Sequence, residues 1–411
     1  MKNRKMYICL FAFLPIFFLV GCRPNQQSSN GSGASSLSTE ASNGNEEPSS
    51  SSGSSSSGAG GSGGEITPSP IEEKSESQEL LEFDKYENNR FYTVTGFKDG
   101  INEKYANARK LVIPSHYKGL AVRHIAHQAF SGNSFIESVS LPSTIIEIGS
   151  EAFKGIKSLA SIYVSPQNKC YKSIDGVLFH IEKIDDNELL VFPPQKRADS
   201  FLIPSDVTSI REFAFLHCFS LKTIKIPATI TSIGYGAFND CKFLDSIEVD
   251  ENNPYFKSVD GVLYSKEKET PKERYGRKVI VYPSGRSAEE YIVPENVKEI
   301  GRNSFSYNSY LTKIVIPETV ERISNSAFQE CKSLRSVTIP SSVDELGSEI
   351  FRNCESLVEV TILGAPDEVG TKLFIGCESL KKVIFSKLRG PMQSWKSSWK
   401  IGCKIEITWA K

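Results

Sequence analysis

A short pattern of apolar positions recurs along most of the chain. Between Ile224 and Leu244 it reads I-x-I-P-x-x-I-x-x-I-x-x-x-A-F-x-x-C-x-x-L. Its phenylalanine returns at Phe130, Phe153, Phe215, Phe238, Phe305, Phe328, Phe351 and Phe374. Five of the seven intervals are 23 residues, and the other two, 62 and 67, equal one interval plus insertions of 39 and 44. A fixed period of this length indicates a stack of similar structural units.

The residues of one unit predict one coil of that stack. Ile224 and Ile226 share one face of a short strand, and Pro227 ends the strand because proline cannot donate to a sheet ladder. Ala237-Phe238 then begins the return across the coil. An amphipathic helix is excluded because the proline recurs with the pattern, at Pro142, Pro227, Pro317 and Pro340. We therefore predict a β-rich solenoid, a leucine-rich-repeat array with 23-residue coils whose parallel strands stack about 4.8 Å apart.

The two long intervals contain related insertions, at about residues 165–203 and 250–293. Asp175-Gly176 and Asp260-Gly261 each stand between β-branched and aromatic residues, which is a strong signal for a hairpin turn. We predict two β-hairpin insertions that protrude at the edge of a coil. The solenoid is then expected over residues 83–411, with an N-terminal cap at 83–120, repeats at 121–386 and a C-terminal cap at 387–411 that contains Trp395 and Trp399.

The first 21 residues have the features of an export signal. Lys2, Arg4 and Lys5 precede an apolar run from Met6 to Val20, which is short for a membrane span. The run ends in Leu-Val-Gly-Cys22, a sequence similar to the lipobox of bacterial lipoproteins, and this predicts Cys22 as the lipidated first residue of the mature chain. An uncleaved anchor, or an ordinary signal with an incidental cysteine, is the alternative.

Residues 22–82 form the predicted tether. Ser, Gly and Asn dominate residues 23–64, and a segment with so few large apolar groups cannot offset its ordering entropy. We expect a flexible coil that lets the solenoid stand away from a membrane; low complexity without a role is the alternative. The formal net charge of the whole chain is −1. No clustered basic stretch predicts nucleic-acid binding.

A column of small polar residues follows the phenylalanine column by three positions. It contains Cys218, Cys241, Cys331, Cys354 and Cys377, and Asn133 and Asn308 occupy the same position. A position that accepts Cys or Asn needs a small polar group to satisfy backbone inside the coil, so we expect buried free thiols. Disulfides and a metal site are the sharper alternatives. Cys170 and Cys403 lie far apart in the array, and we expect them to be unpaired.

No motif for catalysis, a cofactor or a metal stands out. The chain lacks G-x-S-x-G, H-E-x-x-H, Walker and dinucleotide glycine motifs. His124 and His127 have a spacing that would suit a metal only on a helix, and we expect packed or exposed histidines instead. Gly234, Gly301, Gly347 and Gly370 recur near one column, and we interpret them as turn glycines. We predict a protein that is not an enzyme and has no cofactor.

Binding is expected on the concave strand face, where polar side chains alternate with the buried aliphatic ones. The candidate ligand surface comprises Tyr163, Thr223, Lys225, Glu248, Lys313, Thr338, Glu359, Thr361 and Lys382. Hot spots usually need Tyr, Trp or Arg, and only Tyr163 qualifies. Either modest contributions to affinity therefore add across several coils, or the binding site lies elsewhere. The hairpin aromatics Tyr171, Phe179, Tyr255, Phe256 and Tyr264 are one such alternative site, although they better suit a small core.

The chain resembles the BspA-like leucine-rich-repeat surface proteins of bacteria over roughly residues 84–411. The resemblance rests on I-P-x-x-V/I-x-x-I-G-x-x-A-F-x-x-C-x-x-L, the Tyr/Phe-Lys-Ser-x-Asp-Gly-Val-Leu insertion, Tyr92-Thr-Val-Thr-Gly96, and Trp395 with Trp399. It implies an exported or surface-anchored protein that binds other macromolecules: host extracellular-matrix or plasma glycoproteins, host cells or other bacteria. It carries over no catalytic motif.

The sequence thus leads to two functional hypotheses for a non-enzymatic protein, and an enzyme with an unrecognised site is the third. The first is a lipid-anchored adhesin at the bacterial outer membrane or cell surface, because lipobox, tether and repeat array follow one another in that order. The second is a periplasm-facing structural or carrier-binding lipoprotein. Both use a membrane contact through the lipid anchor on Cys22, and they differ in whether the array faces the outside of the cell.

Overall fold

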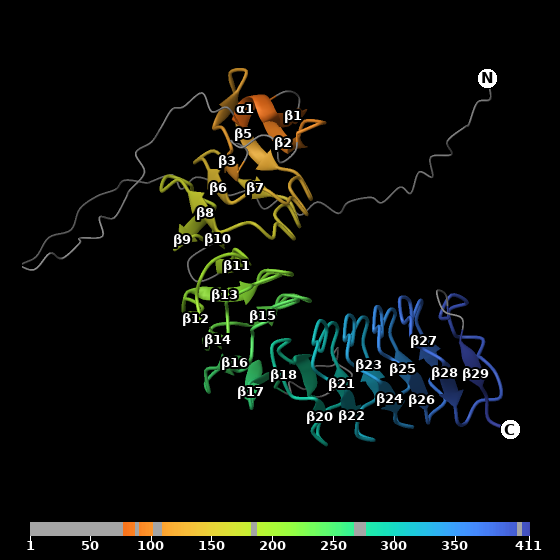
Figure 1. Ribbon diagram of the computed structural model, residues 1–411. Helices are drawn as coiled ribbons and strands as arrows, with labels where there is room; N and C mark the ends of the chain where they lie inside the picture. Colours follow the sequence, from red (N-terminus) through yellow and green to blue (C-terminus); the bar gives the residue numbers. More distant parts are fainter. Residues whose placement is uncertain (1–76, 87–89, 102–108, 182–186, 267–276, 401–404) are drawn as a thin grey trace, which may run out of the picture. The chain divides into compact units, whose positions relative to one another are not determined.

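The computed structural model describes residues 77–86, 90–101, 109–181, 187–266, 277–400 and 405–411 (Figure 1). All of them belong to the unit Ser75–Lys411. The predicted signal peptide, Cys22, the tether up to residue 76 and Cys403 lie outside the described residues, so those predictions stay untested. The described residues contain the short helix α1 (Ser77–Leu80), and none of the helices among them is long and apolar enough to cross a membrane.

The repeat strands form three parallel sheets. Each sheet adds one strand per coil, as in the pairing of Thr223 with Ser246, 23 residues further on. The strands are β3 (Lys110–Val112), β6 (Ser138–Leu141) and β8 (Ser161–Val164); β12 (Ser200–Leu202), β14 (Thr223–Ile226) and β16 (Ser246–Val249); and β20 (Glu290–Ile292), β22 (Lys313–Val315), β24 (Ser336–Ile339), β26 (Glu359–Ile362), β28 (Lys382–Phe385) and β29 (Glu406–Thr408). The predicted solenoid is confirmed.

A second set of short parallel strands closes each coil on its other side. They are β5 (Leu120–Ile125) and β7 (Glu147–Ile148); β11 (Asn187–Val191), β13 (Val207–Ile210) and β15 (Ser232–Ile233); and β19 (Lys278–Val281), β21 (Glu299–Ile300), β23 (Arg322–Ile323), β25 (Glu345–Leu346) and β27 (Glu368–Val369). Most have only two residues, because the chain turns again at once toward the phenylalanine.

Caps and hairpins complete the fold as the sequence predicts. The N-terminal cap pairs β1 (Leu81–Tyr86) with β2 (Phe91–Phe97), and β4 (His116–Tyr117) with β5. At the other end, Trp395 and Trp399 are buried against Phe385, beside β29. The insertions form the hairpins β9 (Tyr171–Ile174)–β10 (Val177–Ile181) and β17 (Phe256–Val259)–β18 (Val262–Ser265).

One buried asparagine anchors each hairpin to the coil before it. The Asn253 side-chain amide donates to the carbonyls of Pro227 and Ile230, both at 2.9 Å, and its oxygen accepts the backbone N–H groups of Tyr255 and Phe256. In the first insertion Asn168 makes the same four hydrogen bonds. Because the pattern is duplicated, the two insertions are equivalent structures.

The phenylalanine column stacks in the core, but not without interruption. Phe328 lies between Phe305 and Phe351, with ring centroids 5.3 and 5.5 Å away. The stacked runs are Phe130–Phe153, Phe192–Phe215–Phe238 and Tyr282–Phe305–Phe328–Phe351–Phe374. The stack of rings is broken at each of the two insertions. The core therefore consists of three segments, which correspond to the three parallel sheets.

The glycine column has a different cause from the one predicted. Gly234 does not have a positive φ; a Cβ there would lie 2.3 Å from the backbone nitrogen of Glu212, and Gly347 and Gly370 meet the previous coil in the same way. The glycines therefore permit close approach of coils, and the interpretation as turn glycines is wrong. The left-handed positions lie two residues before and after the phenylalanine and are mostly not glycine, for example Phe213, His217 and Asp240.

The cysteine column consists of buried free thiols, as expected. Cys331 Sγ donates to the carbonyl of Phe305 at 3.0 Å. Cys241, Cys354 and Cys377 likewise donate to the carbonyl of the phenylalanine that lies 26 residues earlier in the chain. Asn308 fills this position with its amide, accepting two backbone N–H groups of its own turn and donating to the preceding coil. The column thus provides hydrogen-bond partners for buried backbone groups inside the coil.

Candidate binding surface

The outward side chains of the three parallel sheets form the surface that we call the strand face. Every predicted ligand residue lies on it: Tyr163 on β8, Thr223 and Lys225 on β14, Glu248 on β16, Lys313 on β22, Thr338 on β24, Glu359 and Thr361 on β26, and Lys382 on β28. Their neighbours along each strand, such as Ile224 and Ile247, are fully buried. The alternation of the sequence therefore places these side chains correctly, while their role in binding stays a prediction.

The strand face is not one continuous ladder, because each hairpin turn covers a strand edge. The N–H of Ile162 on β8 donates to the carbonyl of Gly176 at 2.9 Å, and the N–H of Ile247 on β16 donates to Gly261 at the same distance. The sequence predicted hairpins that protrude at the edge of a coil. Instead, their turns separate Tyr163 from β12, and β16 from β20.

A cation from the next coil fixes each hairpin turn in this position. Lys196 Nζ donates to the carbonyl of Asp175 at 2.7 Å, and Arg286 donates to the carboxylate of Asp260 at 2.8 Å. Both aspartates have a positive φ, as the turn requires. The hairpin turns are therefore built parts of the strand face.

Charged residues of the strand face pair between neighbouring coils. Lys225 Nζ lies 3.2 Å from Glu248 Oε2, and Lys313 Nζ lies 2.7 Å from Glu290 Oε1. These groups are about half exposed, so each pair contributes little to stability. Their charges remain available to a partner, which must compete with the internal pair.

Sequence reasoning missed the most exposed aliphatic residues of this face. Leu202 on β12 and Ile292 on β20 are 65% and 66% exposed. The hairpin that precedes β12 carries the exposed Ile174, and the hairpin that precedes β20 carries the exposed Val259. The expected boundaries of the insertions include β12 and β20, which are instead regular repeat strands. The segments Phe201-Leu-Ile-Pro204 and Tyr291-Ile-Val-Pro294 match the repeat strand and its proline, and this was the available signal.

The hairpin aromatics are buried, but in the core of the solenoid and not in a small core of their own. Tyr171, Phe179, Phe256 and Tyr264 are buried in three different core segments, and Tyr255 is partly buried beside Phe256. In the second insertion the hydroxyl groups of Tyr264 and Tyr291 form a hydrogen bond. These rings are not available to a ligand, so the alternative site on the hairpin aromatics is not supported.

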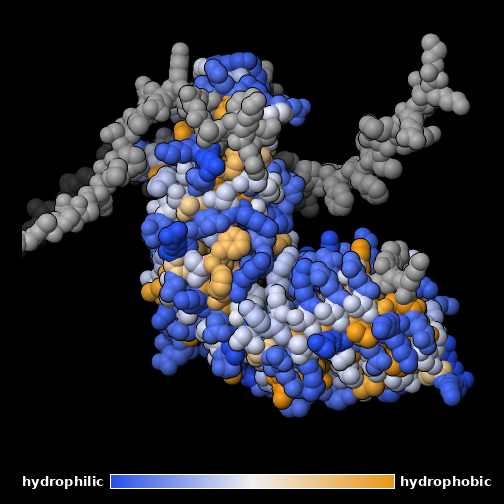
Figure 2. All heavy atoms as spheres, viewed as in Figure 1, coloured by the Kyte–Doolittle hydropathy of each residue, from blue (hydrophilic) through white to orange (hydrophobic). Residues whose placement is uncertain are grey.

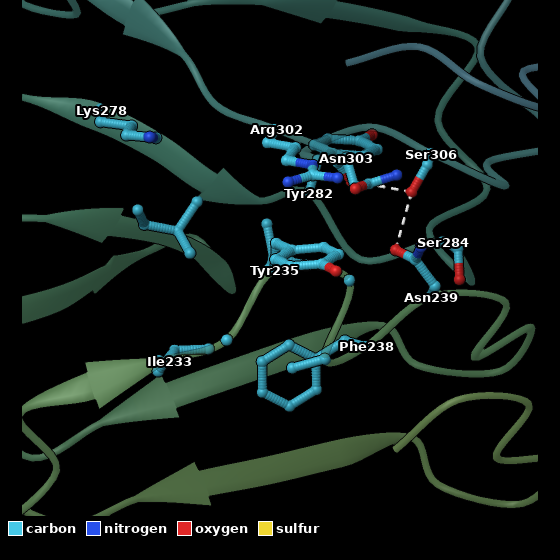
Figure 3. A pocket seen from close by; sticks show the side chains of 15 residues that line it. Ile233, Tyr235, Phe238, Asn239, Lys278, Tyr282, Ser284, Arg302, Asn303 and Ser306 are labelled. Atoms are coloured by element: carbon cyan, nitrogen blue, oxygen red, sulfur yellow. Dashed lines mark hydrogen bonds between the residues drawn. The ribbon is translucent and has the colours of Figure 1, made fainter. Parts of the chain in front are cut away.

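A cavity of about 110 Å³ lies where the second insertion interrupts the ring stack (Figure 3). Tyr235 and Phe238 line it from one coil, Tyr282 from the insertion, and Arg302 from the coil beyond. The guanidinium carbon of Arg302 lies 3.7 Å from the centroid of the Tyr235 ring. A hydrogen bond to the Glu212 carboxylate raises the pKa of Tyr235.

A smaller hollow of about 50 Å³ occupies the equivalent place at the first insertion. There Lys154 Nζ lies 3.7 Å from the centroid of the Phe213 ring. Small-molecule sites usually have volumes of about 300 Å³ or more. Both hollows are smaller, and a cation over a ring spans each one, so we interpret them as consequences of the insertions and not as substrate sites.

Two histidines of the described residues make polar contacts between neighbouring coils. His217 Nδ1 lies 2.7 Å from Asp240 Oδ2, and His127 Nδ1 lies 2.8 Å from the hydroxyl of Ser150. His124 packs against Phe91. No cluster of three or more potential metal ligands occurs within these residues.

Stacked 23-residue coils with an open strand face define a leucine-rich-repeat solenoid. A family model described as the BspA type leucine-rich repeat region matches residues 103–190, 191–259 and 282–395, in six copies. The match covers more than half of the chain, and the chain belongs to this family. Membership indicates protein binding or a role at the bacterial surface, on a fold that typically serves as a binding scaffold.

One solved structure supports the fold. A leucine-rich repeat protein from Eubacterium ventriosum is 21% identical, with a TM-score of 0.51 over 80% of this chain and 82% of that chain. A leucine-rich cell surface protein from Faecalibacterium prausnitzii (22% identity, TM-score 0.39, 75% and 94% covered) and the pneumococcal vaccine antigen PcpA (18%, 0.39, 78% and 86%) are also similar. No curated protein matches the chain.

Proposed function

We propose that the chain is a lipid-anchored cell-surface adhesin that binds host extracellular-matrix or plasma glycoproteins, host cells or other bacteria through its strand face. The observation that carries the proposal is the strand face itself: within each of its three sheets, exposed side chains lie in register on strands whose other face is buried. The expected lipidation of Cys22 and the predicted tether supply the anchor. The family to which the chain belongs supports a surface role.

The mixed chemistry of the strand face favours contacts that add across many coils. Tyr163 is its aromatic candidate at 51% exposure, and the other predicted residues are small or charged. Few single residues should then act as hot spots, and affinity should come from several coils that bind one extended or repetitive partner.

Whole-cell adhesion tests the proposal. Cells that display the full chain should bind to wells coated with matrix or plasma glycoproteins, and deletion of residues 84–411 with export retained should abolish this binding. Unchanged adhesion after the deletion contradicts the proposal. Protease added to intact cells should cleave the chain. A chain that stays uncut would favour the periplasm-facing structural or carrier-binding lipoprotein instead.

A matched pair of variants tests the strand face within the adhesin. Lys225 and Glu248 form an ion pair between coils on the strand face, with side chains 49% and 54% exposed. Lys332 and Glu355 form an equivalent pair in the turns outside it, 49% and 50% exposed. Replacing the first pair by alanines should weaken adhesion, and replacing the second should not. Equal effects would place the binding surface elsewhere.

A further inference from the structure

The six-stranded sheet from β20 to β29 (Figure 1) carries two rows of outward side chains that the strand register aligns. The row at the second outward position consists only of β-branched residues: Ile292, Val315, Thr338, Thr361, Ile384 and Thr408. Ile292 and Val315 are 66% and 37% exposed. Figure 2 shows one face of the molecule, which is mostly hydrophilic with separate apolar patches. β-branched side chains pack well on the pleated surface of a sheet, so a row of this kind suits packing against another sheet.

The other row carries charges in a definite order. In register across the strands it reads Glu290, Lys313, Ser336, Glu359, Lys382 and Glu406. Ser336 on β24 stands at the centre of the first five. On one side of Ser336 the row continues with Lys313 and then Glu290. On the other side it continues with Glu359 and then Lys382. The two halves of the row are therefore opposite in charge at equal distances from Ser336.

This order makes the sheet complementary to itself. A twofold axis parallel to the strands and centred on β24 lays β20 opposite β28, and β22 opposite β26, of a second copy. Glu290 then faces Lys382 and Lys313 faces Glu359, each twice by symmetry. In the β-branched row the same axis puts Ile292 opposite Ile384, Val315 opposite Thr361, and Thr338 opposite itself. Such an isologous contact is the usual form of a closed dimer.

Several other registers of the same contact set like charges against each other. An axis between β24 and β26 sets Glu290 against Glu406 and Lys313 against Lys382. An axis on β22 sets Lys313 against itself, and an axis on β26 sets Glu359 against itself. The axis on β24 gives four opposite-charge contacts and no like-charge contact, whereas an axis between β26 and β28 gives only two, Glu359 with Lys382 in each direction. The charge order therefore favours the register centred on β24.

From the charge order and the matching β-branched row, we propose that the strand face of β20–β28 is an interface with a second copy of this chain, centred on Ser336 and Thr338. Five strands cover about 300 Å² of sheet per copy at a spacing of about 4.8 Å. Stable interfaces bury about 800 Å² per partner. The dimer is therefore weak in solution and forms at high local concentration. The proposal does not rest on the proposed adhesin function.

Complementary charge reversals provide the test. K313E places a glutamate against Glu359 of the second copy, and E359K places a lysine against Lys313 of the second copy. Each variant alone should weaken self-association by roughly tenfold, because both like-charge contacts occur twice. In an equimolar mixture the variants should restore association, since the glutamate that K313E introduces in one copy then faces the lysine that E359K introduces in the other. Sedimentation velocity of the full chain over about 10 to 500 μM measures all three samples.

The control is K225E, because Lys225 lies on the strand face of the separate sheet β12–β14–β16. It should associate like the wild type. A wild-type chain that stays monomeric at the highest concentration overturns the proposal. Association that persists unchanged in both single variants, or that the mixture fails to restore, overturns it as well. Circular dichroism of each variant confirms that the solenoid is intact.

Discussion

Arg302 lies over the ring of Tyr235, with its guanidinium carbon 3.7 Å from the ring centroid, although 67 residues separate the two. Lys154 lies over Phe213 in the same manner at the first insertion, 59 residues away. The stack of core rings is interrupted at both places. Each insertion is thus spanned by one cation–π contact between the coils that flank it.

We expect this contact to contribute measurably to stability. Partly exposed cation–π contacts are worth about 0.5–1 kcal/mol. R302A and Y235A should each reduce the free energy of unfolding in urea, and the double variant should lose less than the sum of the two. Strict additivity would mean that the two side chains do not interact.

A substitution in the ring stack should be far more costly. Phe328 is fully buried between Phe305 and Phe351. F328A should reduce the free energy of unfolding by about 3–5 kcal/mol, because it loses buried area and leaves a cavity. T338A on the strand face should stay within about 0.5 kcal/mol. Similar losses in urea unfolding would contradict the assignment of buried and exposed positions.

The asparagine that anchors the second hairpin offers a neighbouring control. Asn253 is fully buried with four hydrogen bonds, whereas Asn252 is exposed and bonds only to Asp250. N253A leaves two N–H groups and two carbonyls without that partner, at about 1–3 kcal/mol for each group that stays buried. We expect a loss of at least about 2 kcal/mol for N253A, and about 0.5 kcal/mol or less for N252A. Thermal unfolding that ranks the two equally would refute the anchoring role.

The buried thiols predict a loss of stability in alkali. Burial raises the pKa of Cys218, Cys331 and Cys354 above its usual value. Above about pH 8.5 the unfolded chain releases these protons while the folded chain keeps them, so the unfolded state binds fewer protons and stability falls as pH rises. Each such thiol contributes up to about 1.4 kcal/mol per pH unit. Urea titrations between pH 7 and 10 measure the slope, which C354A should reduce.

The same burial should protect the column chemically. Cys331 and Cys354 donate to carbonyls inside the coil, and a buried protonated thiol is a poor nucleophile. Thiol reagents at pH 8 should therefore react with these cysteines only after denaturation, as peptide mapping by mass spectrometry can show. Rapid labelling of Cys331 in the folded chain would contradict this.

The sequence by itself determined the coil. The 23-residue period, the proline after each strand and the phenylalanine column place Ile224, Phe238 and Cys241 inside, and Lys225 outside, because neighbouring coils contact each other at equivalent positions. The Asp-Gly pairs likewise predicted the hairpins at Asp175 and Asp260, since the turn signal is local. These features depend on residues close in sequence or one period apart.

Only the tertiary structure decided how the insertions divide the array. The turn at Gly261 covers the edge of β16, and Arg302 reaches Tyr235 across a cavity. Both contacts depend on the backbone path of the insertions, whose lengths break the 23-residue period. The close approach at Gly234 likewise reflects the separation of two backbones, which the residue type alone does not reveal. The division of the strand face into three sheets follows from these contacts, because an edge that is already hydrogen-bonded to a hairpin turn cannot pair with the next strand.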